Sequence, residues 1–245
     1  MAPSKDYTLL YAASSAATPG AALATILYPK HPYVMIYDIH THHHPSTPGE
    51  AIVQLAPNAF YPQPGHLYSV GLHPWDIHDD WRVQMAGLLI KALHPQAVMI
   101  GETGIDKKNS TTPIEIQEAV FREHIRLSEL LRKPLIIHCV KAFDEILAIR
   151  KATKATLPWI IHGFHGSIEQ WRQLTRAGLH MSVGYHHAPS LIKEIPLADL
   201  LVESDEHDDM EMVYNLVREG TGINVALLKQ HVSDNIHHLV TVQGV

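Results

Sequence analysis

The chain has 245 residues, and 46% of them are hydrophobic, which is enough to build a sizeable core in one domain. Its formal net charge is −6, so the protein as a whole does not attract nucleic acid, whose binding normally draws on a basic face. The single cysteine, Cys139, excludes an intrachain disulfide and suits a reducing compartment, which favours a cytoplasmic location.

The first part of the chain predicts short strands joined by loops. Strand-like runs lie at 51–55 and 67–70, with about nine residues between His42 and the first run and about eleven between the two runs. Parallel crossovers usually need a dozen residues or more, commonly with a helix. Prolines favour loops in the same region: Pro45, Pro48, Pro57, Pro62 and Pro64. We therefore expect the first two βα units to be shortened or distorted, with an exposed loop.

From Ala97 onward, strand-like and helix-like segments alternate. Strands are predicted near 97–102, 134–138, 158–162, 179–183 and 199–203, and helices near 113–132, 141–154, 167–177 and 208–219. The longest helix has Thr112 as a candidate N-cap and Pro113 at its first position. This alternation is typical of a parallel barrel, so the sequence predicts an α/β fold, a (β/α)-barrel of TIM type.

Five strand-like segments end in residues that can bind a metal. In each, an apolar run stops at a His, Glu or Asp: His40 with His42, Glu102, His138, His162 and Asp205. The first two side chains share one strand face and lie roughly 6.5 Å apart, close enough to reach one ion. Such a pair alone also arises by chance in a chain with 20 histidines. Because a parallel barrel brings its strand ends to one rim, we expect the whole set to meet there.

The size of this donor set indicates more than one metal ion. Four imidazoles and two carboxylates exceed the needs of one tetrahedral ion with an open position. Two divalent ions that share a bridging carboxylate account for them better. Histidine with carboxylate ligands suits zinc or manganese better than an all-oxygen magnesium site, although metal supply often decides which of the three is bound.

Two further histidines are candidates for substrate binding. His73 ends another strand-like run and either faces the substrate or supports the ligands. His165 follows His162 by three residues, and it either contacts a phosphate or a third metal or is a polar residue of the rim. Residue type alone does not separate these alternatives, so both histidines stay candidates.

Several of these segments occur in the motif order of a known family. The chain resembles the TatD-like metal-dependent deoxyribonucleases from about residue 34 to its end. The resemblance rests on the ordered set Asp38-Ile39-His40-Thr41-His42, Gly71-Leu72-His73-Pro74, Ile100-Gly101-Glu102-Thr103-Gly104-Ile105-Asp106, Pro134-Leu135-Ile136-Ile137-His138-Cys139, His162-Gly163-Phe164-His165-Gly166-Ser167 and Glu203-Ser204-Asp205. The ordered set is far more specific than any one motif.

The resemblance implies a barrel related to the amidohydrolases and hydrolysis of DNA phosphodiesters by a metal-activated water. It places one divalent ion on His40, His42 and Asp205 and a second on His138 and His162. Glu102 would bridge the two ions. The catalytic residues implied are Asp205, which takes the proton from the water, and Glu102.

The chain also departs from the family pattern. His43 and His44 stand where the family has Leu and Asp after the His-x-His pair, and Trp75 replaces a polar residue. Lys141 lies near the position of the family's cationic phosphate contact, where Arg is common, and it is either a phosphate contact or a solvated lysine. The ligand set is therefore better preserved than the substrate contacts.

These features leave three classes of function open. The first is a phosphodiesterase acting on DNA, and the second is an amidohydrolase-like hydrolase of a small ester, lactone, amide or phosphoester, which the acidic charge and missing arginine favour. The third is a metal-binding protein without catalysis, against which Asp205 argues. We expect DNA or a small phosphoester as the partner and no obligate protein partner. We expect no membrane contact, because no apolar run reaches the roughly 18 residues of a membrane span.

The resemblance also suggests how the chain is divided. Family chains normally begin just before the first ligand strand, where this chain has Met35. We therefore expect residues 1–34 to be an N-terminal extension, to which we assign no function. Residues 35–245 are expected to form the metal-dependent hydrolase barrel.

Overall fold

Eight parallel strands form one sheet in sequence order in the computed structural model, which describes residues 35–187 and 189–241. The expectation for residues 1–34 lies outside the described residues. The strands are β1 (Asp38–Thr41), β2 (Ala51–Leu55), β3 (Leu67–Val70), β4 (Ala97–Asp106), β5 (Leu135–Val140), β6 (Trp159–Ile161), β7 (Leu179–Val183) and β8 (Leu201–Val202). This arrangement confirms the predicted parallel α/β barrel.

The barrel closes where β8 meets β1. Thr41 and Asp205 form an isolated parallel bridge just beyond the end of β8. The backbone N–H of Asp205 donates to the carbonyl of His40 at 2.9 Å, and the N–H of His42 donates to the carbonyl of Asp205 at 3.0 Å. Three of the predicted ligands therefore make the seam that closes the sheet.

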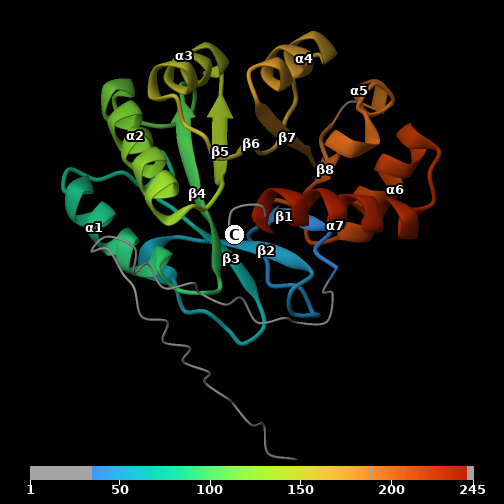
Figure 1. Cartoon of the computed structure of the whole chain (residues 1–245), viewed down its shortest axis with the longest axis horizontal. Helices are drawn as coiled ribbons and strands as arrows, with labels where there is room; N and C mark the ends of the chain where they lie inside the picture. Colours follow the sequence, from blue (N-terminus) through green and yellow to red (C-terminus); the bar gives the residue numbers. More distant parts are fainter. Residues whose placement is uncertain (1–34, 188, 242–245) are drawn as a thin grey trace, which may run out of the picture.

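Seven α-helices pack around the strands in the described part of the chain, and the last two, α6 and α7, follow the final strand (Figure 1). They are α1 (Trp81–Ala92), α2 (Ile114–Leu131), α3 (Phe143–Thr153), α4 (Ile168–Arg176), α5 (Pro189–Ile192), α6 (Met210–Thr221) and α7 (Val225–Thr241). The four helices predicted from the sequence correspond to α2, α3, α4 and α6, with ends within two residues of those expected. The sequence did not predict α1, α5 or α7.

The first two βα units carry no α-helix within the described residues, as the short spacings predicted. Residues 42–50 connect β1 to β2 as turns and loop, and most of them are exposed. The connection from β2 to β3 contains the single short 3-10 helix η1 (Pro57–Ala59). The blue and cyan segments of Figure 1 show this side of the barrel, which is therefore lined by loops.

The start of α2 differs from the sequence prediction. Pro113 occupies the N-cap position, one residue earlier in the helix than expected, and α2 begins at Ile114. The hydroxyl of Thr112 donates to the carbonyl of Ile77, and its own carbonyl accepts the Gln117 side chain at 2.7 Å. The prediction that Thr112 caps the helix is wrong, because its hydroxyl is turned toward the neighbouring loop.

The barrel interior is filled by side chains from every strand. All ten residues of β4 are buried, and the fully buried side chains include Ile39, Ile52, Tyr68, Met99 and Ile136. Buried parallel strands are typically continuous runs of Val, Ile and Leu, which is the pattern that made these strands visible in the sequence. The polar ligands stand at the carboxyl ends of these apolar runs, on a packed core.

A buried histidine ties α2 to the loop that follows β3. The Leu72 N–H donates to Nε2 of His124 at 3.0 Å, and Nδ1 of His124 lies 2.8 Å from the Val120 carbonyl, so the ring is neutral with its proton on Nδ1. Burial lowers the pKa of His124 to about 4. This contact fixes the backbone immediately before His73.

His124→Phe is expected to lower the free energy of unfolding at pH 7 by about 1–3 kcal/mol, because the Leu72 N–H loses its acceptor in a buried setting. Neutral His124 stabilises the fold fully above about pH 6.5, and this contribution is lost as pH falls toward 4, where the folded form titrates. Denaturant unfolding at several pH values should therefore show a shallower acid loss in the variant. An unchanged pH slope, or the same effect from replacing the exposed His78 with Ala, would contradict this role.

Candidate metal centre

All six predicted ligand residues converge at the carboxyl ends of the strands. Five of them line one cavity of about 270 Å³ and His40 is buried behind it; the five are His42, Glu102, His138, His162 and Asp205. They come from β1, β4 and β5 and from the residues directly after β1, β6 and β8. The structure thus brings the set together on one rim, while the ligand roles stay a prediction.

Glu102 lies at the middle of this set and is 3% exposed. Its Oε2 lies 3.4 Å from Nε2 of His40 and 3.5 Å from Nε2 of His42. Its Oε1 lies 2.8 Å from Nδ1 of His138 and 2.8 Å from Nε2 of His162. The two carboxylate oxygens therefore face two different pairs of histidines.

Asp205 adds a second carboxylate to the side of His40 and His42. Its Oδ1 lies 3.5 Å from Nε2 of each of these histidines. The Asp205 side chain is 39% exposed, whereas that of Glu102 is 4% exposed, so Asp205 is the carboxylate that reaches the open part of the cavity. This arrangement pairs a buried central carboxylate with an accessible outer one.

The donor set fits divalent metal ions. Among the described residues, neither ring nitrogen of the fully buried His40 makes a hydrogen bond. Buried polar atoms without partners are costly, so these nitrogens fit a ligand that the polypeptide does not supply. Three groups of donor atoms lie within 4.8 Å of one another: His40, His162 and Asp205; His40, His42 and Glu102; His73, Glu102 and His138.

His73 belongs to the last of these groups. Its Nε2 lies 3.3 Å from Oε1 of Glu102, on the same side as His138. The sequence presented His73 as a substrate contact or a support for the ligands, because it ends a strand as the other candidates do. The structure places it within reach of a metal on that side.

The local backbone holds Glu102 in place. The Glu102 N–H donates to Oε1 of Gln54 at 2.6 Å, and the same oxygen accepts the Ser69 hydroxyl at 2.7 Å. Gly101 has φ of +126°, and a Cβ there would lie 2.2 Å from the Ile136 carbonyl oxygen. Only glycine fits this close approach of β4 to β5, so the residue before Glu102 is fixed by packing.

Two buried carboxylates stand behind the histidines, and the sequence reading gave neither a role. Oδ2 of Asp106 lies 3.3 Å from Nε2 of His138, and Oε1 of Glu203 lies 3.6 Å from Nδ1 of His162. Carboxylates in such positions fix the orientation of an imidazole ligand and raise its basicity. Both residues lie inside the family motifs, yet only distances between side chains reveal what they support.

Opposite charges shift the pKa values in the cluster. Burial raises the pKa of Glu102, but the charge of His162 and close contacts with His138, His162 and His40 outweigh burial and hold that pKa well below its usual range. Burial also raises the pKa of Asp205, but the contacts with His40 and His162 outweigh it and lower that pKa to about 2. Burial and the charge of His162 lower the pKa of His40, but Asp205 and Glu102 raise it overall to about 9. His40 is therefore protonated at neutral pH before a metal binds.

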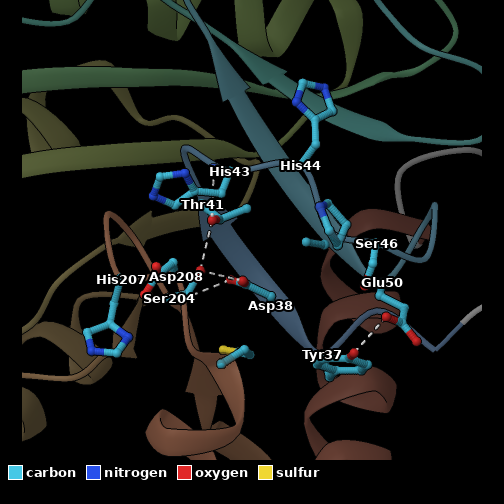
Figure 2. A pocket seen from close by; sticks show the side chains of 13 residues that line it. Tyr37, Asp38, Thr41, His43, His44, Ser46, Glu50, Ser204, His207 and Asp208 are labelled. Atoms are coloured by element: carbon cyan, nitrogen blue, oxygen red, sulfur yellow. Dashed lines mark hydrogen bonds between the residues drawn. The ribbon is translucent and has the colours of Figure 1, made fainter.

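A second pocket of about 210 Å³ lies beside the ligand strands, next to the seam between β1 and β8. Figure 2 shows the buried Asp38 at its base, which accepts the Ser204 hydroxyl at 2.6 Å, and Ser204 in turn contacts Thr41 at 2.8 Å. The exposed side chains of His43 and His44 line the same pocket. Asp38 thus ties β1 to the segment that carries Asp205.

The remaining candidates lie outside the metal cavity. Lys141 is exposed just beyond β5, with φ of 55°, and it is not among the residues that line the cavity. His165 is exposed and lines an adjoining cavity of about 190 Å³ together with Asp205. A substrate role for either residue stays a prediction.

A parallel barrel with histidines and carboxylates at its carboxyl-terminal rim defines a class of metal-dependent hydrolase folds. The model of one family, described as TatD related DNase, matches residues 38–237. The chain therefore belongs to this family, and the resemblance seen in its motifs is confirmed.

Curated relatives cover only part of the chain. The chain is 32% identical to the uncharacterised metal-dependent hydrolase YabD of Bacillus subtilis over 145 residues, which are 56% of this chain and 57% of YabD. It is 32% identical to the 3′-5′ ssDNA/RNA exonuclease TatD of Klebsiella pneumoniae over 148 residues, 56% of each chain. The chain thus spans little more than half the length of these two relatives.

Solved structures agree with the barrel. The crystal structure of the TatD homologue YjjV of Escherichia coli matches with a TM-score of 0.68 and 20% identity, covering 85% of this chain and 99% of that chain. A TatD family hydrolase of Entamoeba histolytica matches with a TM-score of 0.60 and 14% identity, covering 78% and 84%. Identities this low support the fold alone.

Within the described residues, none of the helices combines the length and apolarity needed to cross a membrane.

Binding of a divalent ion at pH 7 is expected to release protons. His40 has a pKa of about 9, and it must lose its proton before the ring nitrogen can bind an ion. Isothermal titration calorimetry in two buffers with different ionisation enthalpies measures this release, which should diminish as the pH is raised above 9. Identical heats in both buffers at pH 7 would contradict the raised pKa.

Proposed function

We propose that this protein is a divalent-metal-dependent phosphodiesterase that hydrolyses single-stranded nucleic acid, with DNA as the first candidate. The observation that carries the proposal is the position of Glu102, whose two carboxylate oxygens face separate histidine pairs. A carboxylate in that position suits a centre of two ions, the kind of centre that many phosphodiesterases use.

The side chains define which residues would hold the ions. His40, His42 and Asp205 would form one site and His138 and His162 the other, with Glu102 between them and His73 in reach of the second. The ions would be zinc, manganese or magnesium. Bound divalent ions supply positive charge to phosphate oxygens and lower the pKa of water toward neutrality.

Asp205 is the residue best placed to accept a proton from the attacking water. Its pKa of about 2 keeps it ionised at neutral pH, and its side chain reaches the cavity. Glu102 also lies close to the histidines, but it is buried, so a water has little access to its carboxylate. Its position between the two histidine pairs suits a role in holding the ions. In this proposal Asp205 would act as the accessible base, and Glu102 would hold both ions.

The names of the relatives support nucleic acid as the substrate. TatD of Klebsiella pneumoniae is a 3′-5′ ssDNA/RNA exonuclease, and a human relative that is 33% identical over 146 residues is a 3′-5′ RNA nuclease. We extend this substrate class to the present chain. We also propose that the protein acts in the cytoplasm, a reducing compartment that suits its single cysteine.

A small ester, lactone, amide or phosphoester is the second candidate substrate. It is favoured by the net charge of −6 and by the position of Lys141, which lies outside the lining of the metal cavity. A neutral small substrate would need no phosphate contacts on the protein surface. A nucleic acid would need contacts to phosphate or base at the mouth of the cavity, whereas a small neutral substrate would need neither.

An assay of metal-loaded protein on matched substrates separates the two candidates. We expect shortening of a single-stranded oligodeoxynucleotide with zinc, manganese or magnesium, and complete loss of that activity with a chelator. Duplex DNA, RNA of the same sequence and a panel of lactones and small phosphoesters are tested in parallel. Turnover confined to the small-molecule panel would reject the nuclease and favour the second candidate.

Asp205→Asn is expected to abolish turnover while preserving most of the bound metal. The amide keeps an oxygen donor but cannot accept the proton from the water, and the loss in turnover should be roughly 100-fold or more. Elemental analysis of the purified variant is compared with its kinetics. Equal losses of bound metal and activity would show that Asp205 acts as a ligand only.

A further inference from the structure

Trp75 occupies the mouth of the metal cavity. It lies in the loop between β3 and α1, lines the cavity together with Glu102 and His138, and is 55% exposed. Of the large apolar side chains exposed in the described part of the chain, Trp75 alone lines this cavity. An aromatic ring is therefore presented to any molecule that enters the site.

The indole is held in one orientation by its polar edge. Its Nε1–H donates to Oδ2 of Asp106 at 2.7 Å, and Asp106 itself is fully buried. The backbone N–H groups of Lys108 and Asn109 donate to the other oxygen of Asp106 at 2.8 Å each. The backbone N–H of Trp75 donates to Nδ1 of His73 at 3.1 Å. A ring fixed before binding loses little conformational entropy when a ligand packs against it.

The ring stands next to the groups that surround Glu102. Its centroid lies 4.8 Å from that of His73 and 5.9 Å from that of His138. A planar group packed on Trp75 would thus adjoin whatever is bound at the metal centre. In a nucleic-acid strand, the planar group next to a phosphodiester is a base.

Charge also favours an aromatic contact here. The protein carries a net charge of −6, and Lys107, the cation nearest to Asp106 in the chain, is paired with Glu145 at 2.7 Å. Lys107 is thus engaged in an ion pair, and the negative net charge gives no general attraction to phosphate. Stacking of bases on aromatic side chains needs no positive charge and tolerates any sequence.

We propose that Trp75 is a stacking platform for a base of the single-stranded substrate, adjoining the phosphodiester at the metal centre. This inference rests on the proposed nuclease function and adds how the strand is recognised. It makes Trp75 a specificity-determining residue, one that favours unpaired bases over duplex and over substrates without a base.

Tryptophan fluorescence gives a direct test that does not depend on turnover. The sequence has four tryptophans, and the other three, Trp81, Trp159 and Trp171, are 8%, 0% and 2% exposed. Metal-loaded protein is titrated with a phosphorothioate-linked oligothymidylate, which resists cleavage, and with an abasic oligomer of equal length and charge. We expect quenching by the oligothymidylate and none by the abasic oligomer, and no quenching in Trp75→Phe.

Binding of the same oligomers by variants tests the energetics. Trp75→Ala should weaken binding of the oligothymidylate about 10-fold, whereas Trp75→Phe, which keeps a ring but loses the N–H donor to Asp106, should retain most of the affinity. Tyr61→Ala removes an aromatic that is 79% exposed outside the cavity and should change nothing.

The outcomes separate this inference from the function on which it rests. The stacking platform would be overturned if the protein bound the abasic and base-carrying oligomers equally well, or if Trp75→Ala left the affinity unaltered. Hydrolysis of DNA by the wild type would still support the nuclease function in either case. If the wild type hydrolyses small esters but neither binds nor cleaves any oligomer, the proposed function fails, and the stacking platform fails with it.

Discussion

The structure depends on one buried carboxylate. Glu102 is 3% exposed, and its two oxygens lie 2.8 to 3.5 Å from all five histidines of the site, which are His40, His42, His73, His138 and His162. A carboxylate at this depth stays ionised only if positive charge lies on both sides of it. His40 and His162, whose pKa values are raised, supply that charge while protonated, and metal ions would supply it in their place. The Glu102 carboxylate therefore accounts for the way the histidines gather around it and for the fit of the site to cations.

The barrel is built to keep this carboxylate central. Glu102 stands on β4, the longest strand, and Gly101 lets β4 approach β5 closely enough for His138 to reach one oxygen. On the other side, β1 and the end of β8 bring His40 and Asp205 together through backbone hydrogen bonds. The backbone contacts that close the sheet therefore also place His40 and Asp205, so a metal bound by these two residues would stabilise the seam.

The parts predicted from sequence were those with local signals. The strands from β2 to β8 were found because apolar, β-branched runs can be recognised without knowledge of distant residues, and the missing crossover helices were visible as short spacings. Helix α1 was not predicted, because apolar residues such as Val83 and Ile90 lie exposed on it, so its apolar positions do not form one face. The supporting roles of Asp106 and Glu203 could not be predicted either, because they depend on distances between strands.

Departures from the family pattern proved informative in a different way. Trp75 stands where a polar residue is common, and the structure shows its indole bonded to Asp106, which in turn lies against His138. The sequence showed the substitution but not the partner that fixes the ring. Lys141, by contrast, sits at a position that looked functional in sequence and lies outside the cavity lining. Whether Lys141 contacts a substrate stays a prediction.

The central claim is that Glu102 separates two metal sites. Anomalous diffraction from crystals soaked in manganese, recorded near the manganese absorption edge, measures the number and position of bound ions directly. The account predicts two peaks, one beside His40 and His42 and one beside His138 and His162, with the Glu102 carboxylate between them. A single peak, or peaks that do not contact Glu102, would contradict it.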